Sequence, residues 1–262
     1  MNEMNLLFNK MKKLFFALLL CCVTAGAQTT TRVLVLAERG GLHEPFTARG
    51  LQWLEQNKER LHLQLTVVND AINLKRGDIN RHQLVLQLNH PPYAWSAEAA
   101  EEFQQYIDGG KGGYVGLHHA TLLGQFDGYP LWQWFSHFMG SIVYKNYIAE
   151  KCDGTVQVED ADHPVMQGVP TTFVIPDDEW YIYEQNPRRH VHVLAHVDEA
   201  SYTTDTGIRM GDHPVIWTNT AKPARNVYFQ FGHSALLWDN AAFLQLFENA
   251  IRWAAGTTTE HP

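Results

Sequence analysis

Cysteine is scarce in this 262-residue chain, which has only Cys21, Cys22 and Cys152. The first two lie in an N-terminal segment that we expect to be removed, so one cysteine remains in the mature protein. A single cysteine cannot form an internal disulfide. The fold must therefore be stabilised by a large hydrophobic core.

Several common catalytic and cofactor motifs are also absent. The sequence contains no G-x-S-x-G, no P-loop and no H-E-x-x-H. The glycines of 109–113 do not have the spacing of a dinucleotide fingerprint. These absences argue against a serine or cysteine nucleophile and against a nucleotide cofactor.

Positive charge is limited, and the formal net charge is −8. No basic block remains once the N-terminal lysines are removed, so nucleic acid and anionic membranes are poor partners. After residue 27 no segment is long and apolar enough to cross a bilayer. We expect a small-molecule ligand, and the composition leaves open a homo-oligomer.

The N-terminus has the three parts of a secretory signal peptide. Lys10, Lys12 and Lys13 form a basic region, an apolar run covers 14–23, and small residues at 25–27 offer a cleavage site. We therefore predict a signal peptide at 1–27, one domain at 28–256 and a polar tail at 257–262. The protein would be exported, to the periplasm or to the medium.

Apolar strands alternate with helical patterns along the first half of the domain, which predicts an α/β fold with a doubly wound, mostly parallel sheet and helices on both faces. Ser96 is a good N-cap, and Asp239 is expected to cap the last helix, which Gly256 ends. The expected strands are 32–37, 63–68, 84–88, 115–117, 155–158, 173–175, 191–195, 215–218 and 226–231, and helices are expected near 46–54, 98–108, 131–139 and 239–255.

Three histidines follow expected strands. His43 lies in the loop after the first strand, His118 directly follows the fourth, and His233 follows the last. The carboxyl ends of parallel strands share one edge of a sheet, so these side chains can converge there. The alternative for each is a hydrogen-bonded structural histidine. Adjacent side chains point in different directions, so His118 and His119 are not expected to bind the same ion, and His118 is favoured. His119 would pack behind it or cap the following helix, and it is also a candidate substrate contact.

A group of carboxylates and aromatics follows Pro176. Glu179 could act as general acid or base, orient an imidazole or ligate a metal, and Asp178 and Trp180 could contact substrate. The alternative is a solvated acidic turn. Two His-Pro pairs occur elsewhere in the chain. His163 is expected to be structural, whereas His213, before an expected strand, is a candidate substrate contact.

An ordered set of short motifs resembles the ThuA-like (trehalose utilisation) family over residues 31–256. The set is 112–118 (GGYVGLH), 162–164 with 168–170, 178–181 (DEWY), 213–217 (HPVIW), 232–233 and 251–256. The resemblance implies a flavodoxin-like sheet of the class I glutamine amidotransferase-like superfamily. The corner that carries a nucleophilic cysteine in amidotransferases carries His118 here, so that chemistry is not expected.

The resemblance also implies carbohydrate catabolism, with a disaccharide or 3-keto-glycoside derivative as substrate of a hydrolase, lyase or isomerase. A C–H next to a ketone is acidic enough for a His or Glu base, and the enolate needs an imidazolium or a metal as electrophile. His43, His118 and His233 suit a divalent ion such as Zn²⁺. The competing hypothesis is a non-catalytic carbohydrate-binding module that uses the same edge.

Overall fold

The computed structural model describes residues 29–257, apart from 127 and 204–206. The expected signal peptide at 1–27 and nearly all of the expected tail lie outside the described residues. Thr31 and the described residues after it form one compact unit. Within the described ranges, no helix has the length and apolar character needed to span a membrane.

Five strands pair in parallel at one side of the sheet. Their order is β2 (Leu63–Val68), β1 (Thr31–Ala37), β3 (Leu84–Leu88), β4 (Gly113–Leu117) and β9 (Asn226–Phe229). The expected strands 63–68 and 84–88 are confirmed to the residue. The inner strands β1, β3, β4 and β9 are buried along nearly their whole length because helices cover both of their faces, whereas the edge strand β2 is largely exposed.

Four further strands extend the same sheet with antiparallel pairing. After β9 come β8 (Pro214–Thr218), β7 (His192–Asp198), β5 (Tyr144–Val158) and β6 (Thr172–Tyr183). The expectation of a mostly parallel sheet is therefore wrong, and the nine strands found in the described residues form a mixed sheet. The described connections within β5–β9 contain only short 3₁₀ turns, and a parallel connection needs a longer crossover, usually a helix.

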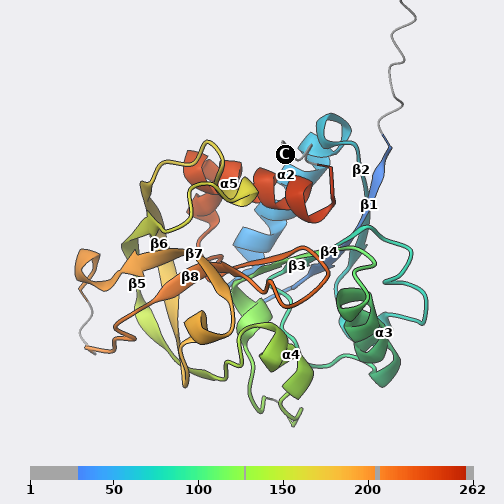
Figure 1. The fold of residues 1–262 in the computed structure, drawn as a ribbon, viewed down its shortest axis with the longest axis horizontal. Helices are drawn as coiled ribbons and strands as arrows, with labels where there is room; N and C mark the ends of the chain where they lie inside the picture. The colour runs from blue at the N-terminus through green and yellow to red at the C-terminus, as the bar shows by residue number, and fades with distance from the viewer. Residues whose placement is uncertain (1–28, 127, 204–206, 258–262) are drawn as a thin grey trace, which may run out of the picture. The chain divides into compact units, whose positions relative to one another are not determined.

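The helices cover both faces of the sheet. Helices α2 (Glu44–Leu61) and α5 (Ala241–Ala254) lie on one face, and α3 (Ala97–Asp108) and α4 (Gln133–Phe138) lie on the other (Figure 1). The alternation of side chains along β1 produces this arrangement. Val33 and Val35 join the core under α2 and α5, whereas the intervening Leu34 joins the core under α3 and α4.

Helix caps agree with the sequence at two positions and differ at one. Ser96 caps α3 by accepting a hydrogen bond from the Ala99 N–H at 3.1 Å. Gly256 follows the last turn of α5 with φ of 73°, a conformation that favours glycine. The expected cap Asp239 instead pairs with Arg49, and Asn240 caps α5.

Candidate functional site

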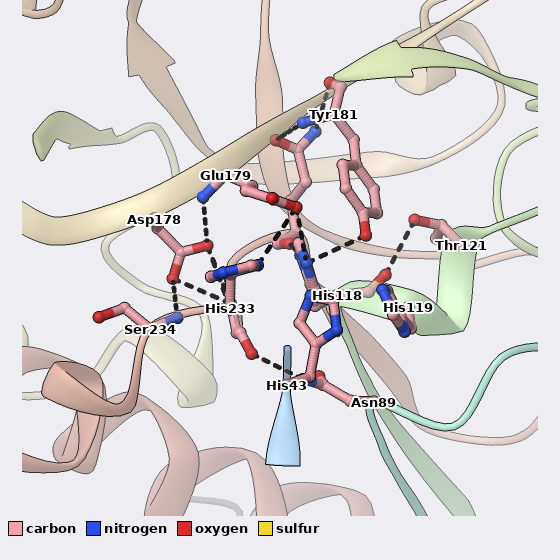
Figure 2. A network of polar contacts seen from close by, with 12 residues as sticks. His43, Asn89, His118, His119, Thr121, Asp178, Glu179, Tyr181, His233 and Ser234 are labelled. Carbon is pink, nitrogen blue, oxygen red and sulfur yellow. Dashed lines mark hydrogen bonds and ion pairs between the residues drawn. The ribbon is translucent and has the colours of Figure 1, made fainter. Parts of the chain in front are cut away.

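The three histidines that follow parallel strands meet at one edge of the sheet. His43 stands at the start of α2, after β1; His118 directly follows β4; His233 follows β9. The ring of His43 lies 5.0 Å from that of His118 and 4.4 Å from that of His233, between centroids. The predicted convergence of these three side chains is confirmed (Figure 2).

A glycine allows the end of β9 to approach the end of β4. Gly232 has φ of 152°, and a Cβ there would lie 3.0 Å from Cβ of His118 and 3.1 Å from Oδ1 of Asn89. Asn89 donates from Nδ2 to the Gly232 carbonyl at 2.6 Å. The close approach of these two strand ends therefore depends on the missing side chain at position 232.

Glu179 joins the cluster from β6, at the antiparallel edge of the sheet. Its Oε2 lies 3.3 Å from Nδ1 of His233 and 3.6 Å from Nε2 of His118. The residue is only 9% exposed, so the alternative of a solvated acidic turn is wrong. Burial acts to raise the pKa of Glu179, but hydrogen bonds and charges from the two histidines outweigh it and hold the pKa below its usual value.

The hydrogen bonds of His118 define its tautomer. Its Nδ1 lies 2.8 Å from the carbonyl oxygen of Gln230, which can only accept, so Nδ1 carries the hydrogen. In the neutral ring Nε2 then has a free lone pair, 3.0 Å from the hydroxyl of Tyr181. Nε2 is therefore the atom of His118 that can bind a cation or accept a proton.

Several buried nitrogens in the cluster lack a protein partner. Among the described residues, none bonds to Nε2 of His43 or to Nε2 of His233, and Nδ1 of His233 contacts only the Glu179 carboxylate, at 3.3 Å. An unsatisfied buried polar atom costs about 1–3 kcal/mol, so these atoms indicate a ligand. Burial and the neighbouring imidazoles lower the pKa of His43 to about 2, which keeps its ring neutral and its lone pair available.

The cluster fits a divalent metal ion. His43, His118, Glu179 and His233 each offer one ligand atom, and these atoms all lie within 4.8 Å of one another. Metal–ligand bonds of about 2.0–2.2 Å place neighbouring ligands of a tetrahedron roughly 3.4 Å apart. The two measured spacings around Glu179, 3.3 and 3.6 Å, agree with that value.

A second carboxylate lies on the other side of His43. Glu38 directly follows β1, and its Oε1 lies 2.9 Å from Nδ1 of His119, while its Oε2 lies 3.7 Å from Nδ1 of His43. Burial raises the pKa of Glu38 to about 7 and lowers that of His119 well below its usual value. His119 thus groups with Glu38 and His43, apart from the ligand set of His118. It caps no helix.

Asp178 supports the loop that carries His233. It is fully buried, and its carboxylate accepts backbone N–H groups of Gly232, His233 and Ser234 at 3.2–3.3 Å. Burial raises the pKa of Asp178, against the effect of these donors. Its oxygens are used within the protein, so the structure places Asp178 behind the cluster and not at the expected substrate contact.

The structure does not bring Trp180 to the cluster. Neighbouring residues of a strand point to opposite faces, so Glu179 faces the site while Trp180 faces away. The Trp180 side chain is completely buried in the core and stacks at 6.0 Å on Tyr202. It has no surface with which to contact substrate, contrary to the expectation.

The two His-Pro histidines are structural in their placement. His213 is fully buried, with Nδ1 2.8 Å from Oε1 of Glu199 and Nε2 3.0 Å from the Tyr181 carbonyl. Because both nitrogens are engaged, His213 has no atom for the expected substrate contact. His163 caps a short 3₁₀ turn by accepting the Val165 N–H at 3.2 Å, which confirms its structural interpretation.

The sequence reasoning missed three residues around the cluster: Glu38, Tyr181 and Gln230. Glu38 could have been found, because it directly follows β1 in the same way as His118 follows β4. Tyr181 stands two residues beyond Glu179 on the same strand face, its ring 4.3 Å from that of His118. Gln230 acts through its backbone oxygen, which no sequence signal marks.

Comparison with known proteins gives one family. The sequence profile of ThuA, described as trehalose utilisation, matches residues 32–254. Among curated proteins, none matches the chain.

Solved structures share the fold at low sequence identity. A ThuA-like protein from Bacteroides uniformis is similar, with a TM-score of 0.77 and 23% identity over 89% of this chain and 94% of that chain. A ThuA-like protein from Parabacteroides merdae has a TM-score of 0.62 and 16% identity over 89% and 93%. A GMP synthase protein from Thermoplasma acidophilum has a TM-score of 0.54 and 12% identity over 87% and 95%.

Proposed function

The chain belongs to the ThuA family of trehalose utilisation, and from that premise we propose that it is an enzyme of carbohydrate catabolism. Its substrate would be a disaccharide or a 3-keto-glycoside derivative, bound at the histidine cluster.

We also propose that the five parallel strands form a flavodoxin-like, doubly wound unit. Their order, β2-β1-β3-β4-β9, supports this proposal because it is the strand order of the flavodoxin type.

The observation that carries the proposal is the set of unpartnered donor atoms in the cluster. Three buried imidazoles and one carboxylate point toward a common centre, and Nε2 of His43 and Nε2 of His233 have no partner among the described residues. A core histidine that served packing alone would satisfy its polar atoms. We propose that His43, His118 and His233 hold a divalent cation such as Zn²⁺, with Glu179 beside them and the fourth position open for a substrate oxygen.

A bound divalent cation would polarise a carbonyl oxygen of the substrate as a Lewis acid. The protein groups handle the protons. The pKa of Glu179 is lowered between His118 and His233, so its carboxylate is ionised and can accept a proton. Tyr181 carries a hydroxyl that burial keeps protonated, because burial raises its pKa, and that hydroxyl can donate.

On a 3-keto-glycoside these groups support an elimination. The ketone at C3 acidifies the hydrogen on C2, and a base removes it as a proton. The electron pair forms the C1–C2 double bond as the C1–O bond breaks, and the departing sugar oxygen takes a proton from a donor. In this proposal Glu179 is the base and the Tyr181 hydroxyl is the donor, each beside His118.

Metal content and turnover test the proposal together. The purified protein should carry about one divalent ion per chain, measured by plasma mass spectrometry after mild purification. His118→Ala should lose that ion and turnover of a 3-keto-glycoside. The exposed His192, which pairs with Asp160 away from the cluster, provides the control His192→Ala, which should keep both.

The possible results separate the alternatives. Turnover without metal would overturn the metal site and leave the metal-free acid/base route. Sugar binding with no turnover of any 3-keto-glycoside, in a metal-loaded protein, would overturn the enzyme and favour a carbohydrate-binding module. Export is part of the proposal and rests on the signal-like N-terminus; sequencing the N-terminus of the mature protein tests it.

A further inference from the structure

A second hollow lies outside the histidine cluster. It has a volume of about 500 Å³, which is in the range of pockets that bind small molecules. Its walls come from the loop after β3, the outer face of α3 and the segment that leads into α4. The lining includes Tyr93, Trp95, Gln104, Tyr129, Trp132 and Gln133.

Two tyrosines form a flat wall of this pocket. The rings of Tyr93 and Tyr129 are stacked, with centroids 6.0 Å apart and planes 21° from parallel. Tyr129 is 42% exposed, so an aromatic face is open to solvent. The C–H groups on one face of a sugar ring are apolar and weakly positive, and they pack against the negative face of an aromatic ring.

The other walls supply hydrogen bonds without charge. Gln104 and Gln133 line the pocket and are exposed, and an amide both donates and accepts, as sugar hydroxyl groups require. Of the lining residues that the structure describes, none is charged. A phosphate or carboxylate ligand would lose water here without gaining an ionic partner, so the pocket favours a neutral polyhydroxylated ligand.

A series of ring contacts connects the pocket with the histidine cluster. Tyr93 lies 5.6 Å from Phe126, Phe126 lies 5.9 Å from Tyr144, and Tyr144 lies 5.2 Å from Tyr181. Tyr181 in turn stacks at 4.3 Å on His118. Packed side chains from the loops after β3 and β4 and from strands β5 and β6 therefore lie between the pocket and the cluster.

We propose that this aromatic pocket is a carbohydrate subsite, separate from the histidine cluster, that binds a neutral sugar of the same class as the substrate. The inference rests on the proposed function for the identity of the substrate, but binding at the pocket needs neither metal nor turnover. Stacking on Tyr129 supplies affinity, and the two glutamine amides select for hydroxyl groups. The subsite would favour disaccharides over single sugars.

Direct binding of trehalose tests the subsite. Saturation-transfer NMR and tryptophan fluorescence titration should detect binding to the full chain, and His118→Ala should bind equally well. Tyr129→Ala should bind roughly fivefold more weakly, because the stacking face is lost. Tyr129→Phe keeps the ring and should remain near wild type. Tyr147, an exposed tyrosine outside the pocket lining, gives the control Tyr147→Ala, which should also remain unchanged.

Charged and apolar probes test the class of ligand. Trehalose 6-phosphate should bind more weakly than trehalose, and phenol should not displace it. Equal binding of trehalose by wild type and Tyr129→Ala would overturn the subsite, as would preference for phenol or for the phosphate. No trehalose binding in a protein that still loads metal and turns over substrate would overturn the subsite while leaving the proposed function intact.

Discussion

At the residue scale, His118 is a side chain fixed in an unfavourable backbone conformation. Its φ is 43°, and a residue other than glycine in the left-handed region costs on the order of 1–3 kcal/mol. The Tyr228 hydroxyl donates to its carbonyl at 2.9 Å and Gln230 accepts its Nδ1–H, and these bonds hold the ring. Strain maintained in this way is typical of reactive positions, and here it directs Nε2 into the cluster.

Tyr181 provides a prediction at the same scale. Tyr181→Phe removes the hydroxyl beside Nε2 of His118 but keeps the ring that stacks on the imidazole. We expect turnover to fall about 10²-fold or more, because the neutral proton donor is lost. Metal content should stay near wild type, since the hydroxyl is not one of the proposed ligands. Steady-state kinetics with metal analysis of the same samples measures both.

Tyr144 provides the matched control. Its ring packs on Tyr181 at 5.2 Å, so Tyr144→Phe removes a neighbouring hydroxyl that has no bond to His118. This variant should keep most of its turnover. An equal loss in both variants would mean that the effect comes from general packing, and Tyr181 would then have no specific role as donor.

At the element scale, the buried pair of His213, which precedes β8, and Glu199, which follows β7, contacts β6 behind the site. Nδ1 of His213 faces the Glu199 carboxylate and Nε2 faces the Tyr181 carbonyl, and both partners can only accept. His213 therefore bridges the Glu199 carboxylate and the backbone of β6. Gln230 bonds to the same carbonyl through Nε2 at 3.1 Å. The pair thus fixes β6 and the end of β9, from which Tyr181 and Gln230 position His118.

Removing one partner of this pair should be costly. In Glu199→Gln the buried His213 loses its carboxylate partner, and we expect the free energy of unfolding to fall by about 3 kcal/mol. His213→Gln should cost a similar amount, and the double variant should cost less than the sum of the two. Urea denaturation at pH 7 measures all three. The exposed pair of Arg76 and Glu101 is the control, and Glu101→Gln should cost less than about 0.5 kcal/mol.

The pH dependence of this pair has a definite sign. Burial acts to raise the pKa of Glu199, but its bonds to His213 and to backbone N–H groups lower it overall. A lowered pKa contributes stability above the unfolded value of about 4.3, and that stability is lost as the pH falls through the folded value. Two results would contradict an interaction between His213 and Glu199. One is a double variant whose loss of stability equals the sum of the two single losses. The other is a Glu199→Gln loss of stability that is the same at pH 7 and at pH 3.

The sequence predicted the parallel elements much better than the antiparallel ones. Strands rich in Leu and Val, such as 63–68 and 84–88, have the predicted limits. Strand β5 covers Tyr144–Val158, but only 155–158 was predicted. Polar and charged residues such as Lys145 and Asp153, together with register shifts against β6, remove the period-two pattern on which the prediction depends.

At the scale of the whole molecule, the two halves of the mixed sheet contribute different parts of the site. The parallel half supplies His43, His118 and His233 at its carboxyl edge, and β6 of the antiparallel half supplies Glu179 and Tyr181. A general rule of α/β sheets predicted the first group from strand positions alone. No such rule covers the second group, because the fold of the antiparallel extension brings β6 back over that edge.

Acid sensitivity of the folded molecule can be traced in part to His163. This residue lies between β5 and β6, and its ring packs on Trp253 of α5 at 4.7 Å. Burial lowers its pKa to about 4, with an opposing effect of Asp160. Well above pH 6.5 the ring is neutral in both the folded and the unfolded chain, so its titration does not affect the free energy of unfolding. Between pH 6.5 and 4 the unfolded chain binds a proton that the folded chain excludes, so stability falls as the pH falls.

A substitution that keeps the cap isolates this effect from other buried histidines. His163→Asn retains a side-chain acceptor for the Val165 N–H but cannot bind a proton. Between pH 7 and 4 the wild type should therefore lose about 1–2 kcal/mol more stability than the variant, a value reduced from the full shift because the ring is partly exposed. Denaturant titrations of both proteins across this range measure the difference. If the stability of the wild type and of the variant changed with pH in the same way, His163 would be protonated equally in the folded and unfolded chain. The contact between α5 and the β5–β6 connection would then not depend on a neutral ring.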